Sequence, residues 1–256
     1  MMPYVSDIEI NRYIGGFLMI VFAHRGASSD YPENTILAFE KAMEIGATGL
    51  ELDVHKSRDN KLVIIHDEDI ERTFKGKGQV CDFTLKELRK FKNRKVMFSE
   101  NNKCEIPTLE EVLDLIKDEV EIVLNIELKT DVISYSEIEN DVIKLVEKYN
   151  MENRIILSSF NHESIRKCKQ INNNIKTGML YYEVCDAIKM AKEINADAIH
   201  PNAQLVTKEL IEECHKNNIK VNSYTVNSPI VMRKFVEWNI DGMFTDSPEL
   251  LLEVVE

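Results

Sequence analysis

Short apolar runs alternate with amphipathic segments along most of this chain. The runs are three to seven residues long, and turn residues bound most of them, which is typical of strands buried on both faces. Between the runs, apolar residues recur at helical spacing, as they do from Ile36 to Ile45, where Gly46 follows as a helix stop. The predicted strands are 19–22, 49–54, 62–65, 122–128, 154–158, 176–180, 198–200, 220–224 and 242–245.

The alternation of strands and helices predicts a parallel sheet, with one exception. Strands 49–54 and 62–65 are joined by a loop much shorter than the dozen or so residues that a parallel crossover needs, so they form an antiparallel hairpin. The other eight strands are the number that closes a (β/α)₈ barrel. We therefore expect one α/β domain over residues 1–256, a TIM barrel with an extra hairpin strand. Residues 1–18 form an N-terminal extension, and residues 67–107 form a small insertion after the second barrel strand.

Acidic residues interrupt two of the predicted barrel strands. Glu51 and Asp53 share one face of their strand, and Glu127 and Lys129 share one face of another, because residues i and i+2 point the same way. Unpaired buried charges are costly unless a metal or an opposite charge compensates them. A structural ion pair between Glu127 and Lys129 is the alternative interpretation. Three carboxylates predict a metal site that suits Mg²⁺ or Ca²⁺ better than Zn²⁺.

Two histidines stand at the ends of predicted strands, beside these carboxylates. Imidazole titrates near neutral pH, so His24 and His66 are candidates for general acid–base catalysis. The alternative for either is an ordinary polar or surface role. His200 also ends a strand, and it is a weaker candidate for lining the barrel mouth.

Arg25 and Lys129 are candidate phosphate contacts, since guanidinium and ammonium groups both bind phosphate oxygens. The alternatives are ion pairs of Arg25 with Glu33 and of Lys129 with Glu127. Asn34 is either a site residue or the N-cap of the helix that follows it.

The composition narrows the class of partner and the compartment. The net charge of −12 argues against a nucleic-acid partner, which needs a basic surface. The five cysteines contain no C-x-x-C pair, as expected for a reduced, cytoplasmic chain. The apolar stretch 17–23 is too short to span a membrane and is interpreted as a strand, not a signal peptide, so no stable membrane insertion is expected.

An ordered set of motifs from about residue 20 to residue 250 resembles the glycerophosphodiester phosphodiesterase family. Each motif is weak alone, and their shared order makes the resemblance specific. The motifs are Ala23-His24-Arg25-Gly26, Pro32-Glu33-Asn34-Thr35, Glu51-Leu52-Asp53-Val54, Ile65-His66-Asp67, Ile106-Pro107-Thr108-Leu109, Asn125-Ile126-Glu127-Leu128-Lys129, Ser158-Ser159-Phe160, Tyr224-Thr225-Val226-Asn227 and Asp241-Gly242-Met243-Phe244-Thr245-Asp246-Ser247-Pro248.

The resemblance implies a TIM barrel that hydrolyses glycerophosphodiesters to glycerol 3-phosphate and an alcohol. The implied partner is therefore a small-molecule substrate. Two positions depart from the family pattern: Tyr224 stands where tryptophan is usual, and Asn161 stands where aspartate is frequent. Both departures bear on substrate preference more than on the reaction. The implied roles are metal binding by Glu51, Asp53 and Glu127, acid–base catalysis by His24 and His66, phosphate contact by Arg25 and Lys129, and contact with the glycerol side by Phe160 and Tyr224.

The sequence leaves several alternatives open. A related barrel could release a cyclic phosphate as its final product, although no clear membrane-docking patch supports a lipid substrate. A non-catalytic binding barrel would not need the two histidines. A sugar-phosphate isomerase or aldolase would show a glycine-rich phosphate loop late in the chain, where Asp246-Ser247-Pro248 stands instead. The preferred headgroup, the choice between Mg²⁺ and Ca²⁺ and a homo-oligomeric state also stay open.

Overall fold

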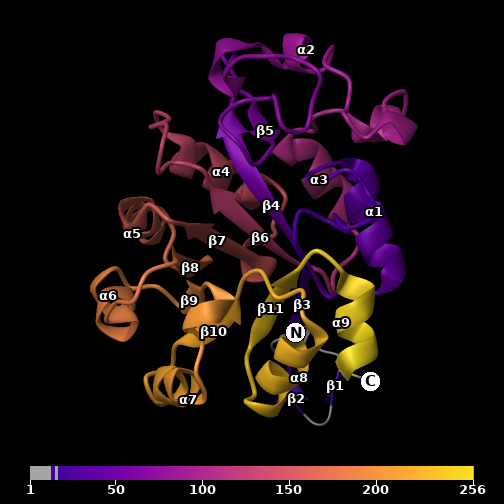
Figure 1. The fold of residues 1–256 in the computed structure, drawn as a ribbon. Coiled ribbons are helices and arrows are strands. Elements are labelled where there is room, and N and C mark those ends of the chain that lie inside the picture. Colours follow the sequence, from indigo (N-terminus) through magenta and orange to yellow (C-terminus); the bar gives the residue numbers. More distant parts are fainter. Residues whose placement is uncertain (1–12, 15–16, 256) are drawn as a thin grey trace, which may run out of the picture.

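The computed structural model describes residues 13–14 and 17–255 and confirms the predicted barrel (Figure 1). Eight parallel strands close on themselves, because β3 pairs with β11 on one side and with β4 on the other. The ninth strand of the sheet, β5, pairs with β4 in antiparallel register, as the short loop predicted. The strands are β3 (Ile20–Ala23), β4 (Gly49–Lys56), β5 (Leu62–Ile64), β6 (Val123–Leu128), β7 (Ile155–Ser159), β8 (Lys176–Tyr181), β9 (Ala198–Pro201), β10 (Lys220–Ser223) and β11 (Gly242–Thr245).

Most of the predicted N-terminal extension lies outside the described residues. Of its span, 1–18, the structure describes two short strands, β1 (Tyr13–Ile14) and β2 (Phe17–Leu18), which pair with each other in antiparallel register. The predicted role of the extension as a separate element therefore stays a prediction.

The helices begin and end where the local sequence indicates. The first helix begins after Thr35, whose hydroxyl accepts a hydrogen bond from the Ala38 amide, and ends at Gly46, whose φ of 99° favours glycine. Thr84 and Thr108 form capping boxes with the glutamates three residues later. The helices are α1 (Ile36–Ile45), α2 (Leu85–Leu88), α3 (Leu109–Ile116), α4 (Ile138–Lys148), α5 (His162–Ile171), α6 (Ala187–Glu193), α7 (Lys208–Lys216), α8 (Pro229–Glu237) and α9 (Pro248–Val255).

The insertion 67–107 packs against the β4–β5 hairpin at the upper edge of the view in Figure 1. It has a small apolar core of its own, built on the hairpin strand and separate from the two larger cores of the barrel. The hairpin therefore anchors the insertion and carries His66 back towards the mouth of the barrel. The buried side chains of this small core are Val63, Ile65, Ile70, Phe74, Val80, Leu88 and Ile106.

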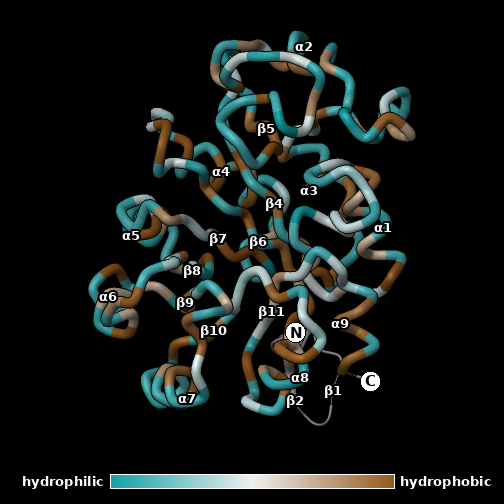
Figure 2. Tube along the Cα trace, in the orientation of Figure 1, coloured by the Kyte–Doolittle hydropathy of each residue, from teal (hydrophilic) through white to brown (hydrophobic). Residues whose placement is uncertain are grey.

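Alternation along the strands separates the apolar core from the polar interior of the barrel. Leu50, Leu52 and Val54 of β4 are fully buried in the layer between sheet and helices. Figure 2 shows that hydrophobic colouring is frequent along the barrel strands. Their neighbours on β4 point to the other side of the sheet. On β9 the polar interior includes His200, whose ring occupies the space that a Cβ at Gly178 would fill, only 2.2 Å away.

Two sequence expectations concern the environment of the chain. In the part that the structure describes, no helix combines the length and the apolar character that crossing a bilayer requires. All five cysteines lie among the described residues, and none forms a disulfide, as expected.

Candidate active site

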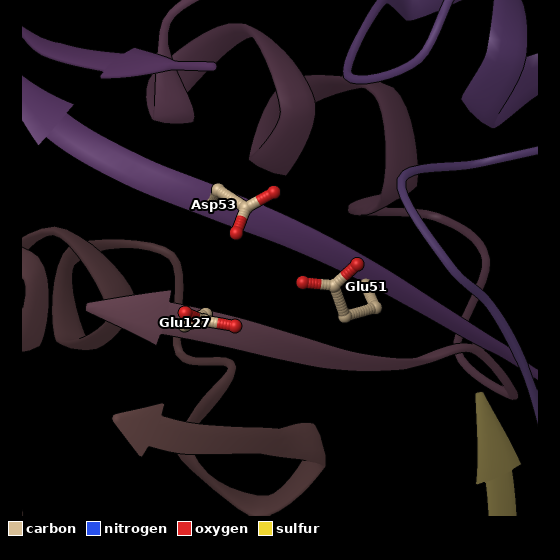
Figure 3. A group of neighbouring side chains, drawn as sticks. All are labelled: Glu51, Asp53 and Glu127. Atoms are coloured by element: carbon tan, nitrogen blue, oxygen red, sulfur yellow. The ribbon is translucent and has the colours of Figure 1, made fainter. Parts of the chain in front are cut away.

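Three carboxylates meet at the carboxyl ends of β4 and β6, where parallel barrels position their functional groups. The register of the two strands pairs Glu51 with Asn125 and Asp53 with Glu127, so the acidic side chains enter the same space. One oxygen of each carboxylate lies within 4.8 Å of an oxygen of the other two (Figure 3). The three residues predicted as metal ligands are therefore neighbours in space.

The electrostatics of this cluster favour a cation. Burial and the nearby charges of Asp53 and Glu127 hold the pKa of Glu51 well above its ordinary value. Burial alone would raise the pKa of Asp53 as well, but Arg25, His66 and Lys129 together hold it low. The group as a whole has more negative charge than its surroundings stabilise. A divalent cation with oxygen ligands would relieve that excess, so the residues present fit Mg²⁺ or Ca²⁺.

Arg25 reaches this cluster through an unusual backbone conformation. Its φ is 59°, a left-handed value that non-glycine residues seldom adopt. Its backbone amide donates to Glu51 Oε2 at 2.8 Å, and its backbone carbonyl accepts from the backbone amide of Asn34 at 2.9 Å. Strain of this kind persists where the surroundings fix it and is frequent at functional sites.

The Arg25 and Asn34 side chains both turn towards Asp53. The side-chain amide of Asn34 donates to Asp53 Oδ2 at 2.8 Å, and Arg25 Nε lies 3.4 Å from the same oxygen. Among residues 13–14 and 17–255, this buried Nε has no hydrogen-bond partner. The alternative interpretation of Asn34 as a helix cap is wrong, because Thr35 is the N-cap of α1.

Lys129 is the second cation of the site, and it follows the end of β6. Its Nζ lies 2.9 Å from Glu127 Oε1 and 3.9 Å from Asp53 Oδ1. It also lies 3.5 Å from Nε2 of His66. The ion pairs considered as alternatives, Lys129 with Glu127 and Arg25 with Glu33, are both present. In this geometry they do not compete with a site role, because each cation keeps its place beside the three carboxylates.

Each predicted catalytic histidine is held by a carboxylate at Nδ1. His24 Nδ1 lies 2.6 Å from Asp246, and His66 Nδ1 lies 2.6 Å from Asp67. A carboxylate in this position orients the ring and leaves Nε2 for proton transfer. Burial lowers the pKa of His24 even though Asp246 opposes the shift. His24 is therefore neutral at pH 7 and able to accept a proton.

Arg72 connects the side of the site that contains Arg25 with the side that contains His66. The sequence patterns did not predict this residue. Its guanidinium binds both oxygens of Glu33, at 2.6 and 2.8 Å, and also binds Asp67. Glu33 in turn lies 2.9 Å from Nη1 of Arg25. One guanidinium from the insertion therefore fixes the carboxylate that orients His66 and the carboxylate that holds Arg25.

Asp246 is the other residue that sequence reasoning left without a role, although it falls in a quoted motif. It follows β11 and accepts hydrogen bonds from Ser28 and Asn227 as well as facing His24. The strand order brings it close to His24, because β11 and β3 are neighbours in the closed barrel. A position directly after a barrel strand was the only signal that could have indicated it.

The two aromatic residues expected on the glycerol side lie together at the mouth. The ring centroids of Phe160 and Tyr224 are 5.8 Å apart, with the rings nearly perpendicular. Tyr224 also lines a small cavity inside the barrel together with His24, Glu51 and the buried His200. His200 is fully buried, so it lines the interior of the barrel and not the open mouth.

Comparisons with known proteins identify the family of this chain. The family model described as the glycerophosphoryl diester phosphodiesterase family matches residues 24–250. A glycerophosphodiester phosphodiesterase of Caldanaerobacter subterraneus subsp. tengcongensis is 43% identical over 240 residues, which cover 92% of this chain and 97% of that protein.

Solved structures of related proteins have the same fold. The glycerophosphodiester phosphodiesterase of Thermotoga maritima is 29% identical with a TM-score of 0.75, covering 92% of this chain and 98% of that one. A phosphodiesterase of Oleispira antarctica, solved in complex with the product sn-glycerol 3-phosphate, is 24% identical with a TM-score of 0.82, covering 92% and 96%. The chain described here belongs to the glycerophosphoryl diester phosphodiesterase family of enzymes.

Proposed function

We propose that this protein hydrolyses glycerophosphodiesters to glycerol 3-phosphate and an alcohol, with a divalent metal and two histidines. The observation that carries the proposal is the placement of His24 and His66, each oriented by a carboxylate, beside the cluster of three carboxylates. A binding protein would not need two oriented proton-transfer groups. The 43% identical relative is a glycerophosphodiester phosphodiesterase, which supports the same reaction class.

The proposed metal ligands are Glu51, Asp53 and Glu127, with Mg²⁺ or Ca²⁺ as the ion. When bound, such an ion lowers the pKa of a coordinated hydroxyl and neutralises charge on a phosphate oxygen. Asn34 supports this set by holding Asp53 through its side-chain amide. The ligands would then be oriented before substrate arrives.

The substrate supplies its own nucleophile, the 2-hydroxyl of glycerol. One histidine accepts the proton of this hydroxyl as its oxygen attacks phosphorus, and the other donates a proton to the departing alcohol. The bond between phosphorus and the alcohol oxygen breaks, and a cyclic 1,2-phosphate forms. Water then opens the ring with the two histidine roles reversed, giving glycerol 3-phosphate.

Arg25 and Lys129 are the proposed phosphate contacts, since they stabilise charge that develops on the phosphoryl oxygens. Nε of Arg25 lies 3.4 Å from Asp53 Oδ2 and makes no hydrogen bond within the described residues, so it keeps a donor for a phosphate oxygen. Phe160 and Tyr224 would contact the carbon face of glycerol. Arg72 is a positioning residue, because it acts on Arg25 through Glu33 and on His66 through Asp67.

The test measures release of sn-glycerol 3-phosphate by the wild type, His24→Ala and His66→Ala. We expect each variant to lose at least ~10²-fold in rate with an alkyl diester, the usual contribution of an acid–base group. With a p-nitrophenyl leaving group, which departs without protonation, the variant that lacks the general acid should recover most of its rate of p-nitrophenolate release, while ring opening, in which the same histidine acts as base, should stay slow. The other variant should not recover.

Three outcomes would contradict the proposal. One is wild-type activity in either histidine variant, and another is rescue of both variants by the activated leaving group. The third is accumulation of the cyclic phosphate as the final product, which would identify a lyase instead of a hydrolase. Fast turnover of bis(p-nitrophenyl) phosphate, which has no neighbouring hydroxyl, would exclude the cyclic route.

A further inference from the structure

A second cavity opens beside the reaction site, over the carboxyl ends of β6, β7 and β8. Its volume is about 420 Å³, and its walls include Asp131, Phe160, Tyr182 and Glu183. We propose that this cavity binds the alcohol part of the diester and selects alcohols that carry a positive charge, such as quaternary or primary ammonium groups. This inference rests on the proposed function and adds a substrate preference to it.

The cavity adjoins the proposed reaction site. Leu180 lines both this cavity and the small one that contains His24 and Glu51. Phe160 lies between them, with its ring centroid 5.8 Å from Tyr224 on one side and 5.7 Å from Tyr182 on the other. A diester whose glycerol contacts Tyr224 and the near side of Phe160 therefore has room to extend its other arm past Phe160 towards Tyr182.

The aromatic walls suit a cation. Tyr182 is 66% exposed, an unusual state for a large ring, and its contact with Phe160 leaves one corner of the cavity aromatic. The two ring planes are inclined at 56°, so their faces are not stacked on one another. An ammonium group gains energy over the face of such a ring, and recognition of quaternary ammonium is a recurrent use of aromatic pockets.

The charged walls favour the same ligand. Asp131 and Glu183 are both exposed, and neither has a basic side chain within 4.0 Å anywhere in residues 13–14 and 17–255. This differs from the reaction site, where Arg25 and Lys129 lie close to the carboxylates. The two carboxylates attract an ammonium group and repel an anionic alcohol.

The chain order fits a diester laid across the two sites. Asp131 stands two residues after Lys129, the proposed phosphate contact. Positive groups therefore meet the phosphate, and negative groups lie where the alcohol would extend. A zwitterionic diester, with an anionic phosphate and a cationic alcohol, matches this order of charges.

The experiment compares two diesters of equal shape. One is sn-glycero-3-phosphocholine, and the other is its neutral isostere, in which 3,3-dimethylbutanol replaces choline. We expect kcat/KM to favour the choline diester by about 10-fold in the wild type, within the range of a cation–π contact at a partly exposed site. Two variants of the cavity, the double variant Asp131→Asn/Glu183→Gln and the single variant Tyr182→Ala, should each reduce this ratio towards 1. Both should leave the rate on the isostere within about twofold of the wild-type rate.

The control is Glu212→Gln/Glu253→Gln, which removes the same two charges from α7 and α9, away from the cavity. It should keep the wild-type ratio. A wild-type ratio near 1, or a ratio that the cavity variants leave unchanged, would overturn the inference while leaving the proposed function in place. Release of glycerol 3-phosphate from neither diester would overturn the proposed function itself and the inference with it.

Discussion

The carboxylates at the two ends of this barrel differ in how their charge is balanced. At the amino end, Asp197 faces Lys169 and Lys176, and Asp241 faces Lys220, so each acid has at least one basic partner. Both acids also accept hydrogen bonds from backbone amides of the sheet. Charge at this end is balanced locally.

At the carboxyl end the balance is incomplete. Glu51, Asp53 and Glu127 face one another, and Arg25 and Lys129 compensate them only in part, as the raised pKa values of Glu51 and Glu127 show. Burial is the largest cause of both shifts, and the charge of Asp53 adds to each. The same fold therefore contains one set of acids whose charge is balanced by basic side chains and one set whose charge a bound cation would balance.

The largest difference in activity is expected between two variants that each neutralise one acid, one at either end of the barrel. Asp53→Asn removes a proposed metal ligand and should lower the rate by at least ~100-fold, because even partners of metal ligands contribute 10- to 100-fold. Asp241→Asn should leave kcat unchanged, since Asp241 lies at the opposite end of its strand pair from the site. Steady-state release of glycerol 3-phosphate measures both; equal losses would contradict the assignment.

A smaller loss of activity is expected for Arg72→Ala, which breaks the connection between Glu33 and Asp67. We expect kcat to fall on the order of 10- to 100-fold, as for other groups that orient catalytic residues. Arg72→Lys should recover little, because an ammonium group cannot reproduce the several hydrogen bonds of a guanidinium fork. The matched control, Arg166→Ala, removes a similarly exposed arginine that pairs with Glu163 on α5. A fall in affinity with unchanged kcat would exclude the positioning role.

Stability should respond in opposite directions at the two ends. Because the pKa of Glu51 is raised in the folded state, its ionisation weakens folding as the pH rises above its unfolded pKa. Glu51→Gln should therefore stabilise the metal-free protein at pH 7. Asp241→Asn should destabilise it by about 1–3 kcal/mol, because it removes ionic hydrogen bonds. Urea unfolding in EDTA measures both, and a loss of stability in Glu51→Gln would contradict the charge excess.

A pH effect of similar size is expected from His200, inside the barrel. Burial lowers the pKa of His200 to about 3. Between the unfolded pKa near 6.5 and this folded pKa, the unfolded chain binds a proton that the folded chain does not. The free energy of unfolding therefore decreases as the pH is lowered through this range. From pH 7 to pH 5 this amounts to about 2 kcal/mol. His200→Asn should lose about that much less over the same interval; an equal pH dependence would exclude a neutral buried His200.

The sequence predicted those parts of the molecule that follow from local patterns. Alternation along β4 and β6 was enough to bring Glu51, Asp53 and Glu127 to one side of the sheet, and the short loop after β4 was enough for the hairpin. The contacts of Asp246 and Arg72 could not be predicted in this way. They depend on closure of the barrel and on the path of an insertion without regular periodicity.

The central claim is that the unbalanced acids form a metal site for hydrolysis of glycerophosphodiesters. The most direct measurement is release of sn-glycerol 3-phosphate by protein treated with EDTA, then supplied with Mg²⁺ or Ca²⁺. The account predicts negligible release after EDTA, recovery with at least one of the two ions, and no recovery in Asp53→Asn. Full activity of the EDTA-treated protein, or equal recovery in Asp53→Asn, would contradict it.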